Sequence, residues 1–569
     1  MAFTDHLSLS FRPKLIDCLK KYSLEDLISD LSSGITVGVV ALPLSMAFAI
    51  ASGLKPEAGI FTAIFAGFII SALGGSKVQI GGPAGAFIVI VYGIVAQYGV
   101  SGLILATIMS GVILFLMGVF KLGSLVRFVP ISIVVGFTNG IAVLIALSQV
   151  KDLLGLKIEN LPADFFPKIE SLVSNVGTFS SETVLLSLAS AVIVFSWAKL
   201  TKLSRISFLQ RLPGSIVALV AGTVAVSVLH LPVETIGTKF GGIPSSLPSI
   251  VIPEFSLSVL KDLFVPALTI AVLGAIESLL CARVADGLIN DRHNPNQELM
   301  AQGVANAVAA SFGGFCATGT IARTVTNVRS GGKTPVAGLI HAITLLVIVM
   351  VAAPLATNIP LATLAAILLF VAYNMGEWHE FVRMKKMMRT YRIIMVVTFI
   401  LTVVLDLTIA FQIGLGLAFL FFVTRVSMLT QLEPMSGLET FGHDKMGGKI
   451  EVYRLSGSLF FGSVHKLEEL VAVGRGSVEF IVLDLSNLLT MDASGMETLK
   501  EVSKKLKEKK CHLLVAGMAG QPWQNLRKSG FLKSLGEDNF FKTTEAALDY
   551  AGKHIKQAQP AQEEQVVYG

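Results

Sequence analysis

The chain has 569 residues, of which 53% are hydrophobic and 15% are charged, and its formal net charge is +6. This composition excludes a water-soluble protein of this size, because apolar runs near the length of a membrane span recur from about residue 34 to 428. Lys and Arg bias around those runs explains the modest positive charge, so we expect no nucleic-acid partner. The four cysteines are scattered without paired spacing, which predicts neither a metal site nor a disulfide framework.

Residues 1–33 precede the first apolar run and are predicted to form a cytoplasmic, amphipathic N-terminal segment. Basic residues such as Lys14 and Lys20 alternate with apolar ones, including Leu15, Leu24 and Ile28. That spacing favours a short helix lying on the membrane surface. No cleavable signal peptide is predicted, because the first apolar run begins too far from the N-terminus.

Fourteen membrane spans are predicted within residues 34–428, the transport domain, so the expected fold class is an α-helical polytopic membrane protein. Their approximate ranges are 34–52, 57–73, 79–98, 101–119, 128–149, 181–200, 214–231, 262–283, 297–315, 320–331, 334–354, 361–375, 391–408 and 410–428.

Charges in the loops predict which side of the membrane each loop faces. With a cytoplasmic N-terminus, the inside loops carry most of the Lys and Arg residues, including the basic loop at 383–392. The outside loops carry few, such as Lys55 and Lys239. Because cytoplasmic loops are enriched in Lys and Arg, this bias places both the N-terminus and the C-terminal domain in the cytoplasm.

Residues 317–335 carry Gly, Thr, Ser, Asn and cations between two strongly apolar runs. Hydrocarbon does not tolerate a lipid-facing irregular backbone, so this segment must be packed inside protein or line a wet cavity. Ile321 to Val328 is predicted to be a half-helix, the tenth span. Free N–H groups at a helix start attract anions, and Arg323 adds a formal charge in the first turn. We therefore predict an anion-binding site at the bilayer midplane.

A second stretch of small residues, Gly81–Ala86, begins the third span. Counting seven spans onward leads to the half-helix that contains Arg323. Gly- and Pro-interrupted spans at matching positions indicate repeats, with a substrate site where two half-helix N-termini meet. Because seven is odd, the second repeat starts from the opposite side, which predicts a 7+7 inverted repeat with half-helices at spans 3 and 10. The alternative is that the small residues only allow helices to pack closely.

Glu277 is an acid within the otherwise apolar eighth span. A buried carboxylate must be neutralised by protonation, by pairing or by a cation. Two roles follow: a coupling-ion site for H⁺ or Na⁺, or a structural partner that holds Arg323. We favour the coupling role. His341 in the eleventh span is interpreted as a packed core residue rather than as a proton relay.

After residue 428 the composition reverts to that of a soluble domain. Strands are predicted at 449–459, 478–486 and 511–516, with a helix from 492 to about 507. Alternating strands and helices predict a small α/β domain over residues 436–555, after a linker at 429–435 and before a disordered tail at 556–569. No Walker motif, nucleophile elbow or dinucleotide fingerprint is found here, so no enzyme is predicted.

Three motifs together resemble the sulfate permease (SulP) family: Gly274–Ser278, Ile321–Arg323 followed by Asn327, and Gly331–Thr334. The resemblance covers essentially the whole chain. It implies a fourteen-span inverted-repeat transporter that precedes a cytoplasmic STAS domain. The segments around Glu277 and Arg323 look most like the bacterial DauA-type C4-dicarboxylic acid transporters of that family, which implies the inner membrane.

The resemblance also implies where the substrate binds. The implied substrate-binding residues are Leu44, Phe48, Ala84, Gly85, Ala322 and Arg323, with Glu277 at the coupling-ion site. Many relatives have a polar residue where Leu44 stands and a serine where Ala322 stands, so the substrate stays open. No metal site is implied.

In the C-terminal domain, Asp492–Gly495 resembles the STAS loop whose serine is phosphorylated in anti-sigma-factor antagonists. Ser494 is therefore a candidate regulatory phosphosite. The alternative is that Ser494 is a helix cap, which is the commoner role of a serine at a helix start.

The expected function is secondary active transport of small anions, with proton-coupled uptake of C4-dicarboxylates (succinate, fumarate or aspartate) as the first hypothesis. The alternatives are Na⁺-coupled bicarbonate transport or proton-coupled sulfate transport and, as other classes, an anion channel or a membrane sensor. No cofactor is expected beyond the coupling ion, H⁺ or Na⁺. The expected partners are a small anionic substrate, the lipid membrane, a second copy of the chain and a cytoplasmic protein at the STAS domain.

Overall fold

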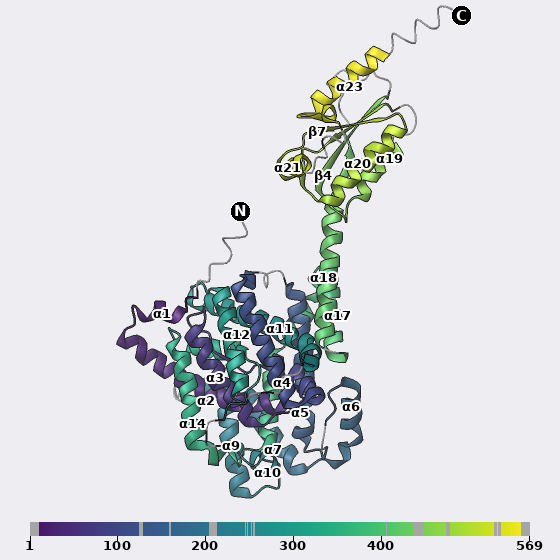
Figure 1. The fold of residues 1–569 in the computed structure, drawn as a ribbon. Helices are drawn as coiled ribbons and strands as arrows, with labels where there is room; N and C mark the ends of the chain where they lie inside the picture. Colours follow the sequence, from purple (N-terminus) through teal and green to yellow (C-terminus); the bar gives the residue numbers. More distant parts are fainter. Residues whose placement is uncertain are drawn as a thin grey trace, which may run out of the picture. The chain divides into compact units, whose positions relative to one another are not determined.

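The chain divides into two compact units, Met1–Leu415 and Gly416–Gly569. The first unit is helical and the second is an α/β domain (Figure 1). The computed structural model describes residues 11–124, 129–158, 161–203, 213–244, 246, 248–251, 253, 257–405, 407–435, 448–473, 478–528, 532 and 536–558.

The helical unit follows the predicted apolar runs closely. Its main helices are α1 (Lys14–Leu19), α2 (Leu24–Ala51), α3 (Pro56–Leu73), α4 (Ile88–Val119), α5 (Ile131–Leu154), α6 (Phe165–Ser174), α7 (Ser181–Leu203), α9 (Gly214–Leu229), α10 (Ile236–Phe240), α11 (Leu257–Ile289), α12 (Pro295–Ser311), α13 (Ile321–Arg329), α14 (Val336–Ala356), α15 (Leu361–Met375), α16 (Trp378–Arg383), α17 (Arg389–Val404) and α18 (Leu407–Leu429).

Seven helices in the described part of the chain are long and apolar enough to cross a membrane, judged by length and composition. One of them, Gly85–Val119, contains a break at Gly99, where φ is 70°. Only glycine adopts that conformation without strain, so Gly99 separates the predicted third and fourth spans. Shorter apolar helices lie at Ser181–Trp197, Gly214–Leu229 and Val336–Val351. The chain is a polytopic membrane protein, while the count of fourteen spans stays a prediction.

Helices α2, α3 and α14 pack against one another, and α12 packs against α3 and α4 (Figure 1). Small residues allow these close contacts. A Cβ at Gly34 of α2 would lie 2.5 Å from the carbonyl oxygen of Ala337 on α14. Helix association in membranes depends on such close packing, because hydrocarbon supplies no hydrophobic force between helices.

The N-terminal prediction is wrong in part, because the amphipathic helix is shorter than expected. Helix α1 ends at Leu19, and α2 begins at Leu24. Ser23 and Asp26 form a capping box at the start of α2, with the Asp26 amide 3.1 Å from the Ser23 hydroxyl oxygen. Leu24 and Ile28 therefore belong to the first turns of the long helix. Residues 1–10 lie outside the part that the structure describes.

Two short strands lie where the third and tenth spans were predicted to begin. Strand β1 (Gly81–Gly82) pairs antiparallel with β2 (Thr318–Gly319), with Gly81 opposite Gly319. Irregular backbone at membrane depth needs hydrogen-bond partners, and each segment supplies them to the other. Strand β1 leads through a short 3₁₀ turn (Gly85–Phe87) into α4, and β2 leads into α13. The predicted half-helix at 321–328 is confirmed.

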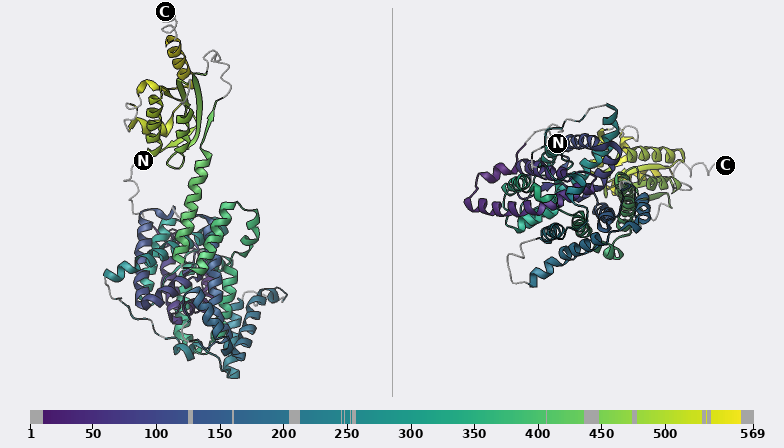
Figure 2. Two further views of the ribbon diagram at one scale, coloured as in Figure 1. Left: turned by 90° about the vertical axis from the view of Figure 1, so that its right-hand side faces the viewer. Right: turned by 90° about the horizontal axis from the view of Figure 1, so that it is seen from below.

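The C-terminal unit is a mixed sheet with helices on both faces (Figure 2). Its strands run in the order β3-β4-β5-β7-β8, with β6 also paired to β4; only the β3–β4 pair is antiparallel. The elements are β3 (Gln431–Pro434), β4 (Ile450–Leu459), α19 (His465–Val473), β5 (Phe480–Asp484), β6 (Leu488–Met491), α20 (Ala493–Glu508), β7 (His512–Ala516), α21 (Gly520–Lys528), β8 (Phe540–Phe541) and α23 (Thr544–Ala558).

Alternating side chains on the strands build two cores in this unit. Ile481 and Leu483 of β5 pack with α19, α20 and α21 on one face. Phe480 and Val482 pack with α23 on the other face. Because successive strand residues point to opposite faces, one buried strand serves both cores. The predicted strands and the helix at 492–507 are confirmed.

Two boundary predictions need correction. Residues 431–434, predicted to lie in a linker, form the edge strand β3, which pairs with β4. The predicted disordered tail begins inside α23, which continues to Ala558. Residues 559–569 lie outside the described chain.

Candidate functional site

The β1–β2 pair brings two helix N-termini face to face. In an antiparallel pair the two chains leave in opposite directions, one toward α4 and the other toward α13. The two helices therefore diverge from the pair with their N-terminal ends directed at it. Each helix start carries a partial positive charge, so the pair marks a site of positive potential.

Neither helix start is closed by a side chain. Ala84 is the N-cap residue of the 3₁₀ turn that leads into α4, Thr320 is the N-cap residue of α13, and neither makes a side-chain cap hydrogen bond. The Thr320 hydroxyl instead donates to the carbonyl oxygen of Ile80 at 3.0 Å. The first intrahelical hydrogen bond of α13 runs from the Thr324 amide to the Thr320 carbonyl oxygen. Ala322, in the first turn, is exposed. The first-turn amides of α13 thus remain available to an anion.

Arg323 lies in this first turn and is 2% exposed. Its Nη2 atom donates to Ser45 Oγ of α2 at 3.0 Å and lies 3.4 Å from the Pro83 carbonyl oxygen. Its Nη1 atom is buried without a hydrogen-bond partner among the described residues. A guanidinium held only by neutral groups leaves uncompensated positive charge beside the two helix starts.

Four of the implied substrate-binding residues come from α2 and from the 3₁₀ turn that leads into α4. Phe48 and Ala84 are buried, while Leu44 is half-buried one helical turn before Phe48. Gly85 faces Phe48: a Cβ at Gly85 would lie 3.6 Å from Phe48 Cε1. The small residues at 84 and 85 therefore allow Phe48 of α2 to lie close to the backbone of this turn.

Gly85 also faces two residues that the sequence did not predict to be part of the site. A Cβ at Gly85 would lie 3.4 Å from Met375 Sδ and 3.6 Å from Ile145 Cδ1. These side chains come from the end of α15 and from α5. Ser45, which holds Arg323, was missed as well. A serine in an apolar helix usually bonds its own backbone, and Ser45 also does so, donating to Ala41 at 2.7 Å.

Glu277 lies on the face of α11 that packs along β2 and α13. One turn before it, the Gly274 carbonyl accepts from the Thr318 hydroxyl at 3.0 Å. One turn after it, Cys281 contacts the Thr324 hydroxyl at 3.2 Å. Residues three and four apart share a helix face, so Glu277 is directed toward the start of α13. The described contacts include no ion pair between Glu277 and Arg323.

The other motif residues anchor α13. Asn327 donates to the Val78 carbonyl at 2.8 Å and accepts from Ser33 at 2.6 Å. Buried Asp30 of α2 accepts from the amides of Lys333 and Thr334. These contacts hold the C-terminal end of the short helix and the turn that follows it.

Another buried carboxylate, Glu298, joins three segments around the site. It is fully buried and accepts from the Gly75 amide at 2.9 Å and from Ser278 at 3.3 Å. Ser278 in turn accepts from Gln79 and Gln302, both at 2.9 Å. Sequence reasoning missed Glu298; Pro295 followed by an acid in the first turn of α12 was the available signal.

His341 is fully buried, and neither ring nitrogen has a partner among the described residues. Its ring packs against Gly67, where a Cβ would lie 3.4 Å from Nδ1. This packing matches the interpretation of His341 as a core residue.

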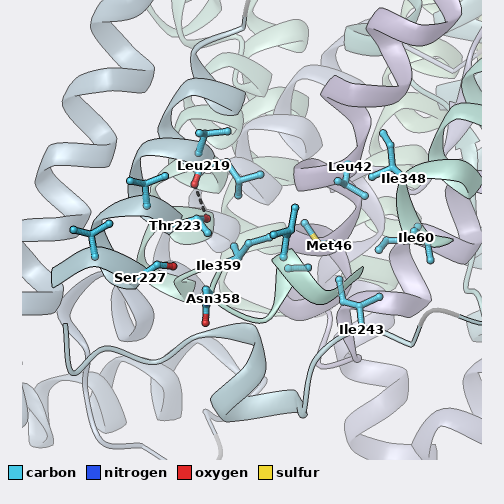
Figure 3. A pocket seen from close by; sticks show the side chains of 16 residues that line it. Leu42, Met46, Ile60, Leu219, Thr223, Ser227, Ile243, Ile348, Asn358 and Ile359 are labelled. Atoms are coloured by element: carbon cyan, nitrogen blue, oxygen red, sulfur yellow. Dashed lines mark hydrogen bonds between the residues drawn. The ribbon is translucent and has the colours of Figure 1, made fainter. Parts of the chain in front are cut away.

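A cavity between α2, α9 and α14 is separate in character from this site. Its volume is about 410 Å³, and its walls are formed by residues such as Leu42, Met46 and Leu219 (Figure 3). No charged side chain lines it. It is therefore not the anion site.

In the C-terminal unit, the capping interpretation of Ser494 is wrong. Asp492 is the N-cap of α20, and its side chain accepts from the Gly495 amide at 2.8 Å. Ser494 is exposed in the first turn. Its hydroxyl is therefore accessible, while phosphorylation stays a prediction.

Curated relatives resemble the chain over most of its length. It is 40% identical to a putative sulfate transporter, YvdB of Bacillus subtilis, over 92% of this chain and 97% of that protein. It is 30% identical to the bicarbonate transporter BicA of a Picosynechococcus species, over 93% of this chain and 96% of that protein.

Solved structures show the same fold. The transmembrane domain of a cyanobacterial BicA matches 69% of this chain and 99% of its own, with a TM-score of 0.62 and 30% identity. The overall structure of SLC26A9 matches 96% of this chain and 93% of its own, with a TM-score of 0.81 and 18% identity. The chain thus has the fold of a helical membrane transporter with a C-terminal domain.

Two family profiles together cover most of the chain. The Sulfate permease family matches residues 27–398, and the STAS domain matches residues 447–547. The first match spans more than half of the chain and includes all three motifs that suggested the family. The protein therefore belongs to the sulfate permease family and carries a C-terminal STAS domain.

Proposed function

We propose that the protein is a secondary active transporter that binds a small anion between the N-termini of α4 and α13. The observation that carries this proposal is the pair of helix starts that face each other without side-chain caps. Partial positive charges and free amides at both helix starts favour a negative ligand. Relatives named as sulfate and bicarbonate transporters support transport of an anion.

In this proposal the anion contacts backbone amides directly, and Arg323 supplies long-range attraction. Ala84, Gly85 and Ala322 have little or no side chain, so the ligand can approach both helix starts. Leu44 and Phe48 form the apolar wall on α2. Ser45 keeps the guanidinium beside the site by accepting its hydrogen bond.

Coupling is assigned to Glu277. Its face of α11 is the one that contacts β2 and α13, and the described contacts include no ion pair between Glu277 and Arg323, which favours the coupling role over a purely structural one. A proton would neutralise the carboxylate directly. A sodium ion would instead use oxygen ligands, which the nearby Gly274 carbonyl and the Thr318 hydroxyl provide.

Three substrates follow from the sequence and the relatives: C4-dicarboxylate, bicarbonate and sulfate. The named relatives favour bicarbonate or sulfate. The C4-dicarboxylate hypothesis rests on the resemblance of the segments around Glu277 and Arg323. The compact helix starts, with small residues at 84, 85 and 322, suit a compact oxyanion or one carboxylate group equally.

We further propose that the protein resides in the bacterial inner membrane as a homodimer, with its N-terminus and STAS domain in the cytoplasm. Positively charged inside loops support this orientation. The exposed Ser494 and the STAS domain are then available to cytoplasmic partners.

Counter-flow in proteoliposomes tests the function. Vesicles loaded with unlabelled fumarate, bicarbonate or sulfate are diluted into the same labelled anion, with matched empty vesicles as the control. A transporter accumulates label transiently above equilibrium for its own substrate. Flux that saturates poorly and shows no counter-flow would indicate a channel, and binding without flux would indicate a sensor; either result would refute the proposal.

A further inference from the structure

The apolar cavity between α2, α9 and α14 has the size of a ligand site. Its volume of about 410 Å³ falls within the range of about 300–1,000 Å³ that is usual for small-molecule pockets. One wall is formed by Leu42 and Met46 of α2, and the opposite wall by Leu219 and Thr223 of α9 (Figure 3). Because the walls are almost wholly apolar, water gains few hydrogen bonds inside.

The walls of the cavity continue into the outer surface of the helical unit. Val220, Val224 and Val228 of α9 line the cavity and are exposed, and so is Leu355 of α14. Helices α9 and α14 are both apolar helices of the membrane unit. Exposed apolar side chains at membrane depth face hydrocarbon, so the bilayer reaches the mouth of the cavity.

Polar groups are gathered at one end. Ser227 and Asn358 lie at the same edge of the cavity (Figure 3). Thr223 is occupied by its own helix, because its hydroxyl donates to the Leu219 carbonyl at 2.7 Å. The segments after α9 and after α14 face outside in the predicted topology, so this polar end lies toward the outer membrane surface.

We propose that the cavity binds one acyl chain of a phospholipid from the outer leaflet. The chain fills the apolar space, and the polar ester region lies beside Ser227 and Asn358. Each methylene group that is transferred from water to an apolar site contributes about 0.8 kcal/mol to binding. An acyl chain that enters from the bilayer is already out of water, so its binding free energy comes only from close packing against the cavity walls. The site is therefore selective for shape and exchanges with the bulk lipid.

The bound chain supports the part of α2 that holds Arg323. Leu42 and Met46 lie one turn apart on the face toward the cavity. Between them lie Pro43, which removes a helix hydrogen bond, and Ser45, which accepts from Arg323. The acyl chain thus fills space behind a weakened turn of α2, apart from the anion site itself.

Native mass spectrometry of protein released from nanodiscs of a single phosphatidylcholine tests the site without any substrate. Val224→Phe and Ala356→Phe fill the cavity from two sides. Val192→Phe makes a matched change on α7, at an exposed residue outside the lining. We expect one retained phospholipid per chain in wild type and in Val192→Phe, and at least a tenfold lower retained fraction in both filling variants.

Thermal melting in lipid-free detergent checks that the filling variants fold, and we expect their Tm to equal or exceed that of wild type. Equal lipid retention in wild type and in the folded filling variants would overturn the proposal. So would a retained ligand whose mass is not that of the phosphatidylcholine. Neither result depends on whether the anion-transport proposal is correct.

Discussion

Arg323 is a cation held inside the membrane unit by neutral partners. Ser45 and the Pro83 carbonyl accept hydrogen bonds from its Nη2 atom. Its Nη1 atom has no hydrogen-bond partner in the described structure. A buried charge that is only partly compensated is costly, and intramembrane charges of this kind mark ion or substrate pathways. An anion between the helix starts would offset that cost.

Replacing Arg323 by Ala should therefore weaken anion binding while the protein stays folded and inserted. A lost charge-assisted interaction costs about 1.5–3 kcal/mol, which corresponds to roughly a 10- to 150-fold weaker Kd. Radioligand binding to purified protein measures this loss. Arg329→Ala removes an exposed cation from the last turn of the same helix and should bind like wild type. Unchanged affinity in Arg323→Ala would refute the role of Arg323.

Glu277 gives the second residue-level prediction. If the coupling ion is a proton, uptake should rise as external pH falls, and Glu277→Gln should lose this pH dependence but keep substrate exchange. Exchange need not move the coupling ion, and Gln mimics the protonated carboxyl. Uptake and exchange in proteoliposomes across a pH series measure both properties.

A Glu277→Gln protein with the wild-type pH profile would end the proton hypothesis. Uptake that requires Na⁺ and ignores pH would assign the carboxylate to a cation site instead. Weaker binding at every pH, with the profile unchanged, would indicate a structural role for Glu277.

At the scale of elements, the β1–β2 pair sets the geometry of the site. Gly82 lies in β1 with φ of 154°, and a Cβ there would lie 2.0 Å from Arg323 Nη1. Any side chain at 82 must therefore displace the guanidinium. The strand pair needs glycine here for close approach as well as for its backbone conformation.

Gly82→Ala should lower the Tm and weaken anion binding together, because the added methyl group clashes with the Arg323 side chain. Gly93→Ala is the matched control, since nothing lies within 4 Å of a Cβ at this position in α4. Alanine in a helix interior is favoured over glycine by roughly 0.5–1 kcal/mol, so the control should not lose stability. Thermal melting and radioligand binding distinguish the two variants; wild-type behaviour of Gly82→Ala would contradict the geometry.

The sequence predicted those elements whose signals are local. Polar and small residues from 317 to 335 stand out against apolar neighbours, so α13 and its Arg323 were found. Alternating residues predicted β4, and an apolar run predicted β5 as a buried strand. The strand β3 was missed, because the four residues Gln431–Pro434 show no local strand pattern and form a strand only by pairing with β4. The pairing of Gly81 with Gly319 and the contact of Ser45 with Arg323 join distant parts of the chain, and no local pattern encodes them.

At the scale of the whole molecule, the chain consists of two compact units with separate cores. Every proposed ligand of the anion precedes residue 330. The STAS unit has its own sheet and its own buried side chains, and none of the residues proposed for the site belongs to it.

Removing residues from 436 onward should leave anion binding intact in a properly inserted protein. The expected Kd lies within about twofold of the wild-type value, because no proposed contact is lost. The same truncation combined with Arg323→Ala should fail to bind, which shows that the measured binding occurs at the same site. If the inserted truncation lost binding outright, the STAS unit would have to belong to the site.

The most direct test places a competing anion at the start of α13. Ala322 is exposed in the first turn, so Ala322→Asp should fold and bring a carboxylate to the free amides. Ala322→Asn is nearly the same size without the charge. In radioligand binding with sulfate, bicarbonate and fumarate, we expect Ala322→Asp to lose affinity for the substrate at least tenfold more than Ala322→Asn does. Equal affinities in the two variants would contradict an anion site between the N-termini of α4 and α13.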